Sequence, residues 1–114
     1  MNKVCILDYG SGNVGSVFNL LTFLKTNVSI SNAEDDIINS THLILPGVGS
    51  FGSSMKKINK TLPIQLLEKE VLSKNKPFLG ICVGMQVLAN NGLEFGDYKG
   101  LGWIEGTVDQ LNSK

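Results

Sequence analysis

Short, mostly apolar runs alternate with segments of helical periodicity along this chain. The apolar runs lie at residues 4–7, 28–30, 43–45 and 78–81. Runs of this length that end at glycine, proline or polar residues are typical of strands buried on both faces. We therefore predict four strands at these positions.

Between these runs, apolar residues recur at intervals of three and four. Val14, Val17, Phe18 and Leu21 show this spacing after the first run. The spacing predicts helices at residues 14–25, 53–59, 63–72 and 83–89, and the third opens on a proline, which suits a first helical turn. After residue 92 the chain becomes rich in glycine and charge, and residues 103–108 form a β-like stretch.

Strands that alternate with helices predict an α/β fold in which helices cover both faces of a parallel sheet. The 114 residues make one domain and leave no room for a second of ordinary size. Ligands of such sheets gather at the carboxyl ends of the strands. The loops at residues 8–15, 46–52 and 82–84 are therefore the candidate sites of chemistry.

Composition narrows the classes of partner. Ten lysines balance ten acidic residues, and arginine is absent, so no electrostatic signature for nucleic acid or an anionic membrane is visible. No apolar stretch approaches the length of a membrane span or a secretory signal. Cys5 and Cys82 form no C-x-x-C pair. We expect a cytoplasmic protein with free thiols, no metal and no cofactor.

Residues 10–15 (GSGNVG) fit the dinucleotide-binding pattern G-x-G-x-x-G between a strand and a helix. Two features argue against a nucleotide: Asp8 places a carboxylate where a pyrophosphate would lie, and Glu34 lies beyond the tip of the second strand. The favoured interpretation is a glycine turn that lets helix and strand pack closely. A nucleotide site is the alternative.

The segment at residues 80–84 (GICVG) has the form of a nucleophile elbow between a buried strand and a helix. Such a turn would project the Cys82 side chain outward, and the helix N-terminus would favour its thiolate. The Val83 amide would face a developing oxyanion. Cys5, in contrast, lies inside an apolar strand and is interpreted as a structural thiol.

The glycine-rich segment at residues 46–52 follows a predicted parallel strand. Loops of this kind can turn backbone N–H groups toward an anion or a developing oxyanion. Many turns between a strand and a helix contain glycine, so this segment by itself is a weak signal. It indicates an oxyanion site only in combination with a nearby cysteine nucleophile. Together the two segments predict an oxyanion site.

Three segments resemble the class I glutamine amidotransferases: residues 8–13 (DYGSGN), 45–51 (LPGVGSF) and 79–86 (LGICVGMQ). More narrowly they are similar to the glutaminase subunits of imidazole glycerol phosphate synthases, as are residues 100–106 (GLGWIEG). The similarity covers nearly the whole chain, in the same order and spacing.

The resemblance implies a flavodoxin-like three-layer fold and hydrolysis of glutamine to glutamate and ammonia through a cysteine thioester. The ammonia would pass to a (β/α)8-barrel cyclase subunit in histidine biosynthesis. By position, Cys82 would be the nucleophile and Gln86 would hold the substrate. Asn13 would face the partner. The oxyanion hole would come from Gly47, Val48, Gly49 and Val83.

The chain departs from the family pattern because it lacks the His/Glu pair that completes the triad near the end of a longer domain. His42, the single histidine, opens a strand at its amino end, away from the site, and is interpreted as structural. We therefore expect residues 1–114 to be the amino-terminal part of one such domain, with an open sheet edge and negligible activity alone. A paralogous glutaminase that serves amidination of a nucleotide-linked sugar and a non-catalytic partner-binding fragment are the alternatives.

Overall fold

The computed structural model describes residues 1–111 and is built on a parallel sheet of four strands. The strands are β1 (Val4–Leu7), β2 (Val28–Ser31), β3 (His42–Leu45) and β4 (Phe78–Gly80), in the order β2-β1-β3-β4. All four predicted strands are confirmed, with ends that differ by one residue.

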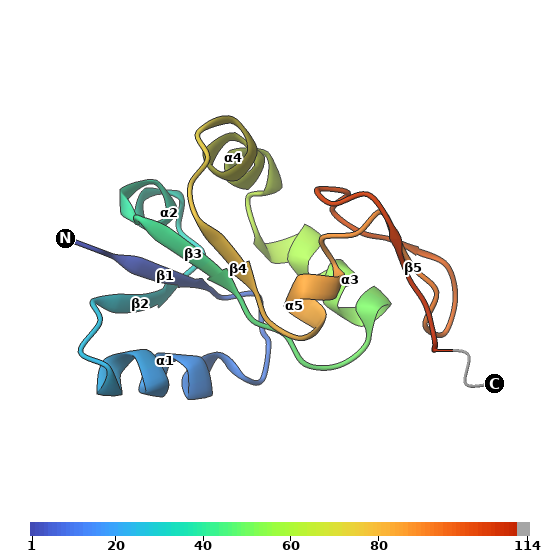
Figure 1. The fold of residues 1–114 in the computed structure, drawn as a ribbon, viewed down its shortest axis with the longest axis horizontal. Coiled ribbons are helices and arrows are strands. Elements are labelled where there is room, and N and C mark those ends of the chain that lie inside the picture. The colour runs from blue at the N-terminus through green and yellow to red at the C-terminus, as the bar shows by residue number, and fades with distance from the viewer. Residues whose placement is uncertain (112–114) are drawn as a thin grey trace.

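Helices cover both faces of this sheet, as predicted (Figure 1). Helix α1 lies on one face and α2, α3 and α4 lie on the other, while α5 lies beyond the end of β4. Their bounds are α1 (Val14–Phe23), α2 (Glu34–Asn39), α3 (Phe51–Thr61), α4 (Ile64–Glu68) and α5 (Val83–Gln86). Helix α2 was not predicted, because a six-residue helix with one buried side chain, Ile37, has no visible periodicity.

Two helices differ from the prediction. The segment expected to be one helix at residues 63–72 changes after α4 into a π-helical turn, Lys69–Ser73. Helix α5 ends at Gln86 instead of residue 89, because the amides of residues 87–89 still donate to the preceding turn but their carbonyl groups accept from another segment. The Val87 carbonyl accepts a hydrogen bond from the Leu101 amide at 2.7 Å, and the Ala89 carbonyl accepts one from Gly102 at 3.0 Å. Hydrogen bonds to a distant segment thus take the place of those that a longer helix would make to these carbonyl groups.

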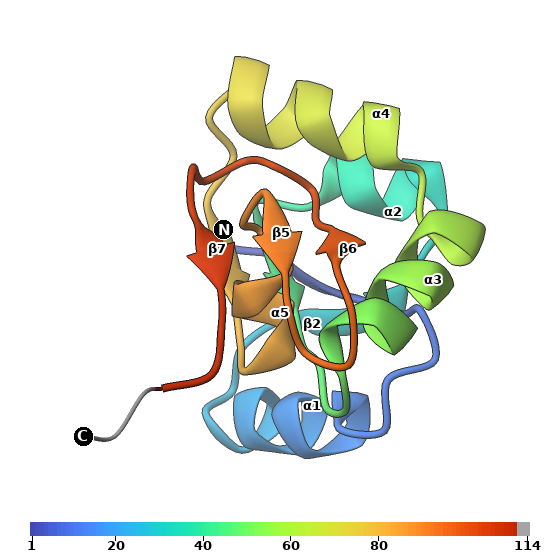
Figure 2. The ribbon, with the colours of Figure 1, turned by 90° about the vertical axis from the view of Figure 1, so that its right-hand side faces the viewer.

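A second, small sheet lies beside α3 and α5 (Figure 2). It contains β5 (Asn91–Gly92), β6 (Tyr98–Lys99) and β7 (Thr107–Val108), in the order β6-β5-β7. Only the last two residues of the β-like stretch predicted at 103–108 form a strand. Trp103, within that stretch, instead anchors the segment to α4: its Nε1–H donates to Glu68 Oε2 at 3.1 Å.

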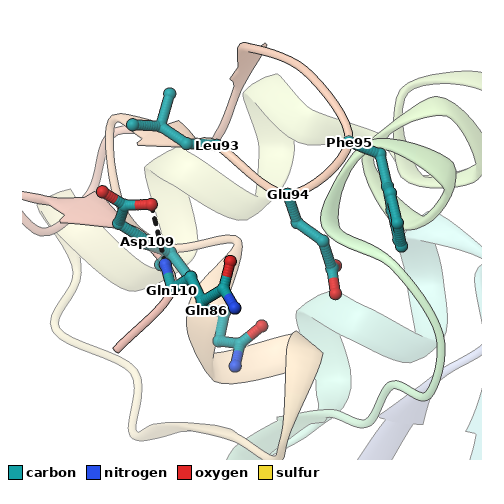
Figure 3. A pocket seen from close by; sticks show the side chains of 7 residues that line it. Gln86, Leu93, Glu94, Phe95, Asp109 and Gln110 are labelled. Carbon is teal, nitrogen blue, oxygen red and sulfur yellow. Dashed lines mark hydrogen bonds between the residues drawn. The ribbon is translucent and has the colours of Figure 1, made fainter. Parts of the chain in front are cut away.

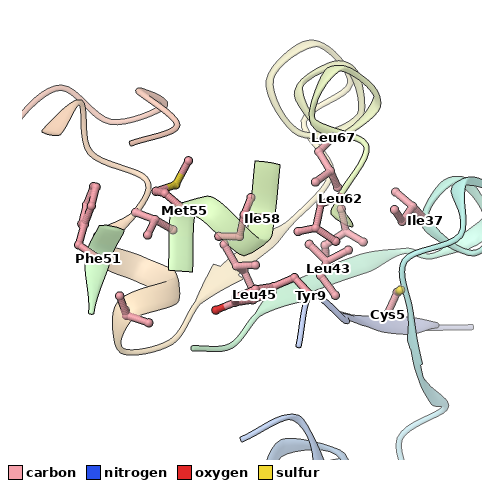
Figure 4. Packing of buried hydrophobic residues seen from close by; sticks show 13 residues of the cluster. Cys5, Tyr9, Ile37, Leu43, Leu45, Phe51, Met55, Ile58, Leu62 and Leu67 are labelled. Atoms are coloured by element: carbon pink, nitrogen blue, oxygen red, sulfur yellow. The ribbon is translucent and has the colours of Figure 1, made fainter. Parts of the chain in front are cut away.

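The main core lies between the sheet and helices α2, α3 and α4 (Figure 4). Side chains alternate along a strand, so Cys5 and Leu7 of β1 and Leu43 and Leu45 of β3 point into this layer. The buried residues that complete it come mostly from the helices and include Ile37, Phe51, Met55, Ile58, Leu62, Leu67, Val83 and Val87.

The opposite face is covered over only part of its width. One row of side chains crosses it in the order Ile30, Ile6, Ile44, Leu79. Helix α1 packs against β1 and β2, and Ile6 is fully buried, whereas Leu79 on β4 is 55% exposed. Strand β4 has no second neighbour among the described residues. The expected open edge is therefore present, and it borders an incompletely covered face.

None of the helices in residues 1–111 is long and apolar enough to cross a membrane.

Candidate functional site

The strand–turn–helix predicted around Cys82 is confirmed. Cys82 lies between β4 and α5 with φ +55° and ψ −124°, a backbone conformation that L residues rarely adopt and that is typical of functional turns. The glycines on either side permit it. A Cβ at Gly80 would lie 2.6 Å from the Met85 Cα, and one at Gly84 would collide with the Leu45 carbonyl oxygen. A larger residue at Gly80 would therefore disrupt the turn from within, and one at Gly84 would push it off the end of β3.

Cys82 is exposed and forms no disulfide. Next to it, the Val83 amide donates to no acceptor among residues 1–111, although its side chain is buried. A free amide beside an exposed thiol is suited to stabilise the oxyanion that develops on a carbonyl oxygen when the sulfur attacks the carbonyl carbon. Helix α5 has four residues where seven were expected, so its dipole supports the thiolate less than predicted.

The loop at residues 46–50 lies directly against this turn. Gly47 is buried with no space for a side chain, because its Cβ position is filled by a Val83 methyl group, the Tyr9 hydroxyl oxygen and the Gly84 nitrogen. Val48 and Gly49 are exposed, and Gly49 has φ +104°. The structure thus brings Gly47 and Val83 together, as predicted, and leaves the next two residues of the loop open to solvent.

A pocket of ≈ 520 Å³ adjoins α5 (Figure 3). It is lined by Gln86, one turn after Cys82, together with residues of the β5–β6 loop and the segment after β7. Glu94 points into the space between α5 and the amino end of α3, and its Oε1 accepts a hydrogen bond from the Phe51 amide at 3.2 Å. The pocket therefore combines two amide side chains, Gln86 and Gln110, with two carboxylates, Glu94 and Asp109, and Gln86 connects it to the helix that follows Cys82.

Glu94 was missed in the sequence. It lies in the β5–β6 loop, without periodicity or a recognised spacing, and it reaches the site because the β5–β6 hairpin packs on α3. Nothing in the sequence distinguishes one acidic residue in an irregular segment from other surface carboxylates. Folding alone places it beside Gln86.

The turn at residues 10–15 corrects one interpretation. A Cβ at Gly15 would meet nothing within 4 Å, so close packing of helix on strand does not require that glycine. Gly10 is needed for its conformation instead, with φ +91°, and its amide donates to Asp8 Oδ1 at 3.3 Å. Asn13 accepts a hydrogen bond on Oδ1 from the Ser11 hydroxyl at 2.7 Å and is half-buried.

His42 and Cys5 lie away from the site. His42 begins β3 and its Nδ1 is 2.8 Å from the Thr41 hydroxyl, so it is at the end of the sheet opposite to the turn that holds Cys82. Cys5 is fully buried, and burial, followed by the charge of Asp36, raises the pKa of its thiol. The described residues contain no cluster suited to a metal ion.

Comparisons with known proteins agree with this geometry. The sequence matches the family model "Glutamine amidotransferase class-I" over residues 5–97. Imidazole glycerol phosphate synthase subunit HisH of Zymomonas mobilis is 45% identical over 115 residues, covering 96% of this chain and 54% of the relative. HisH 2 of Vibrio vulnificus is 44% identical over 110 residues, covering 96% and 51%. The chain thus spans about half the length of the curated relatives it matches.

Solved structures show the same fold. A crystal structure of a glutamine amidotransferase superimposes with a TM-score of 0.75 at 20% identity, covering 93% of this chain and 55% of that one. A putative peptidase E protein from Listeria monocytogenes superimposes with a TM-score of 0.71 at 13% identity, covering 90% and 63%. These likenesses establish the flavodoxin-like α/β architecture. The family match, which includes both the turn around Cys82 and the loop that faces it, shows that this chain belongs to the class-I glutamine amidotransferase family.

Proposed function

We propose that this chain carries the nucleophile and the oxyanion site of a glutaminase that supplies ammonia to imidazole glycerol phosphate synthase. The observation that supports it most is the exposed Cys82 held at positive φ beside the unpaired Val83 amide, in a chain of this family. The identity of 44–45% to synthase subunits supports histidine biosynthesis as the destination of the ammonia.

In the proposed reaction, the thiol of Cys82 and the backbone N–H groups around it each have a distinct role. The Cys82 sulfur attacks the side-chain amide carbon of glutamine, and the carbonyl oxygen becomes an oxyanion. The Val83 amide and N–H groups of residues 47–49 stabilise that charge. The thiol proton passes to the amide nitrogen, the C–N bond breaks and ammonia leaves. Water then hydrolyses the thioester to glutamate and restores the thiol.

The pocket beside α5 suits an amino acid. Glu94 supplies a carboxylate for the α-ammonium group, and Gln86 supplies an amide that hydrogen-bonds to the substrate. A ligand held this way has its side chain directed from the pocket toward Cys82, because Gln86 lies one turn along the same helix.

The same similarity supports a proposal for the domain and for the partner. The chain is the amino-terminal part of a single glutaminase domain, and Asn13 at the start of α1 faces the cyclase barrel. The relatives are named as subunits of a synthase, which supports a second subunit as partner.

Labelling tests the site without requiring turnover. An L-glutamine analogue in which a chloromethyl ketone replaces the amide should alkylate Cys82 and leave Cys5 unmodified, as read by peptide mass spectrometry. L-Glutamine should protect the thiol, and the D-analogue should react at least tenfold more slowly. Glu94→Gln should raise the analogue concentration that gives half of the maximal labelling rate about tenfold, since one charge-assisted hydrogen bond is lost.

Iodoacetamide is the control for thiol access, because it makes no use of the pocket. Its rate with Cys82 should be the same in the wild type and in Glu94→Gln. Equal labelling by both enantiomers of the analogue, with no protection by glutamine, would contradict the proposal.

The purified 114-residue polypeptide should release negligible ammonia from glutamine. Its single histidine lies at the far end of β3, so no imidazole is placed to take the thiol proton or to return it to the leaving nitrogen. A coupled glutamate dehydrogenase assay measures the rate, with Cys82→Ser as the blank. A rate clearly above that blank would show that another group acts as the base.

A further inference from the structure

The Tyr9 side chain is not explained by the proposed chemistry, yet it touches the oxyanion loop. It is 3% exposed, and its hydroxyl donates a hydrogen bond to the Pro46 carbonyl oxygen at 2.6 Å. The same hydroxyl fills part of the space beside the Gly47 Cα. Figure 4 shows the Tyr9 ring lying next to Leu45, at the end of β3.

This hydrogen bond fixes more than one carbonyl group. The Pro46 carbonyl and the Gly47 amide belong to a single planar peptide unit, in which the C=O and N–H point in opposite directions. Holding the oxygen toward Tyr9 therefore also sets the direction of the Gly47 N–H. Burial raises the pKa of the Tyr9 hydroxyl, so the group stays protonated and able to donate through the neutral pH range.

The next peptides of the loop have no such restraint among the described residues. Val48 is 53% exposed, the Gly49 Cα has nothing within 4 Å of its Cβ position, and the amides of both donate to no acceptor in residues 1–111. The loop therefore has one end fixed by a buried side chain and another end in solvent.

We propose that Tyr9 is a positioning residue that fixes the Pro46–Gly47 peptide, so that rearrangement of the oxyanion loop is confined to the peptides that follow Gly47. The inference rests on the proposed function only in calling this loop the oxyanion loop. Tyr9 itself touches neither the thiol nor the substrate pocket.

Backbone ¹⁵N relaxation dispersion on the full chain tests the proposal, with Tyr9→Phe as the variant and Tyr98→Phe as its matched control. In the wild type, the Gly47 amide should show no exchange contribution. In Tyr9→Phe, the population of a second Gly47 peptide orientation should rise about five- to tenfold, because one buried hydrogen bond is lost. Tyr98→Phe removes a hydroxyl whose bond to the Phe95 carbonyl is long, at 3.5 Å, and should leave Gly47 unchanged.

Each outcome decides the matter. New exchange at Gly47 with amides of β1 and β3 unaffected supports a positioning role. Exchange that spreads equally over both strands shows a general loss of packing and overturns the proposal, as does an unchanged Gly47 in Tyr9→Phe. Exchange at Gly47 in the wild type overturns it without any variant. The relaxation measurement does not depend on Cys82 chemistry. The proposal for Tyr9 can therefore be contradicted while the analogue still labels Cys82, and the proposed function can be contradicted while Tyr9 still fixes the Gly47 peptide.

Discussion

Glu70 is buried, yet both of its carboxylate oxygens lie close to a lysine. Lys76 Nζ is 2.9 Å from Oε1, and Lys74 Nζ is 3.0 Å from Oε2. Lys76 also donates to the carbonyl oxygens of Ile37 at 2.7 Å and Ile38 at 3.1 Å. Because these carbonyls lie near the C-terminus of α2, a cation there is favourable. One buried pair thus joins the turn after α4 to the end of α2.

The pH dependence of stability follows from the same contacts. Hydrogen bonds from Lys76 and then Lys74 lower the pKa of Glu70 in the folded protein. The stabilisation that ionised Glu70 gives the folded state is therefore complete above the unfolded-state pKa, about 4.3. It is lost as the pH falls through the lower folded-state pKa. Glu70→Gln should lower the unfolding free energy at pH 7 by about 2–3 kcal/mol and should flatten its decline in acid.

Urea unfolding between pH 3 and pH 7 measures both effects. Glu105→Gln is the control, because Glu105 is exposed and forms no ion pair among the described residues. An acid profile for Glu70→Gln that parallels the wild type would show that the pair does not govern acid stability.

Helix α1 ends in a hydrogen-bonding pattern that normally uses glycine. The Thr26 amide donates to the Leu21 carbonyl at 3.0 Å, and the Lys25 amide donates to Thr22 at 2.9 Å. This is the Schellman arrangement, in which the residue after the C-cap adopts the left-handed conformation. Lys25 occupies that position with φ +59°, at a steric cost that glycine would not have.

Lys25→Gly should therefore raise the unfolding free energy by about 0.5–1 kcal/mol, the relief of strain exceeding the added freedom of the unfolded chain. Lys56→Gly, at an exposed position inside α3, is the matched control and should lower it by about 1 kcal/mol. Thermal and urea unfolding give both values. Destabilisation by Lys25→Gly would mean that contacts of the lysine side chain stabilise the native state by more than the strain at its positive φ destabilises it.

At the scale of the whole molecule, strands β2 and β4 form the two edges of the parallel sheet, and β4 is the edge next to the Cys82 turn. Strand β4 presents unpaired backbone groups, and Leu79 lies beside a cavity of ≈ 210 Å³ lined by residues 42–44 and 77–79 and by Val4. Edges that combine free N–H and C=O groups with apolar side chains pair readily with another chain. The turn that holds Cys82 directly follows this edge strand, so whatever pairs with β4 lies close to Cys82.

We expect this polypeptide to self-associate through β4 at raised concentration. Leu79→Lys should raise the dissociation constant at least tenfold, since it removes an apolar contact and adds a charge to the edge. Sedimentation equilibrium measures the constant. Phe95→Lys, which removes an exposed aromatic ring from the β5–β6 loop, is the control. An equal effect of both changes would place the contact elsewhere.

The sequence by itself determined the parallel sheet and the strand–turn–helix around Cys82, the nucleophile that we propose. Buried strands in a parallel sheet are continuously apolar, so β1 and β3 are visible as runs of residues. The turn around Cys82 is equally local, because Gly80 and Gly84 are required by contacts within a few residues and with the adjacent strand end. Signals of this kind need no knowledge of distant segments.

Tertiary structure decided what depends on distant partners. The length of α5 was set by hydrogen bonds from residues 101–102 to its following turn, and Glu94 joined the pocket through the β5–β6 hairpin, which packs on α3. The same is true of Tyr9, whose hydroxyl meets a carbonyl 37 residues away. Such contacts leave no periodicity in the sequence, because each joins single residues whose separation along the chain follows no repeat.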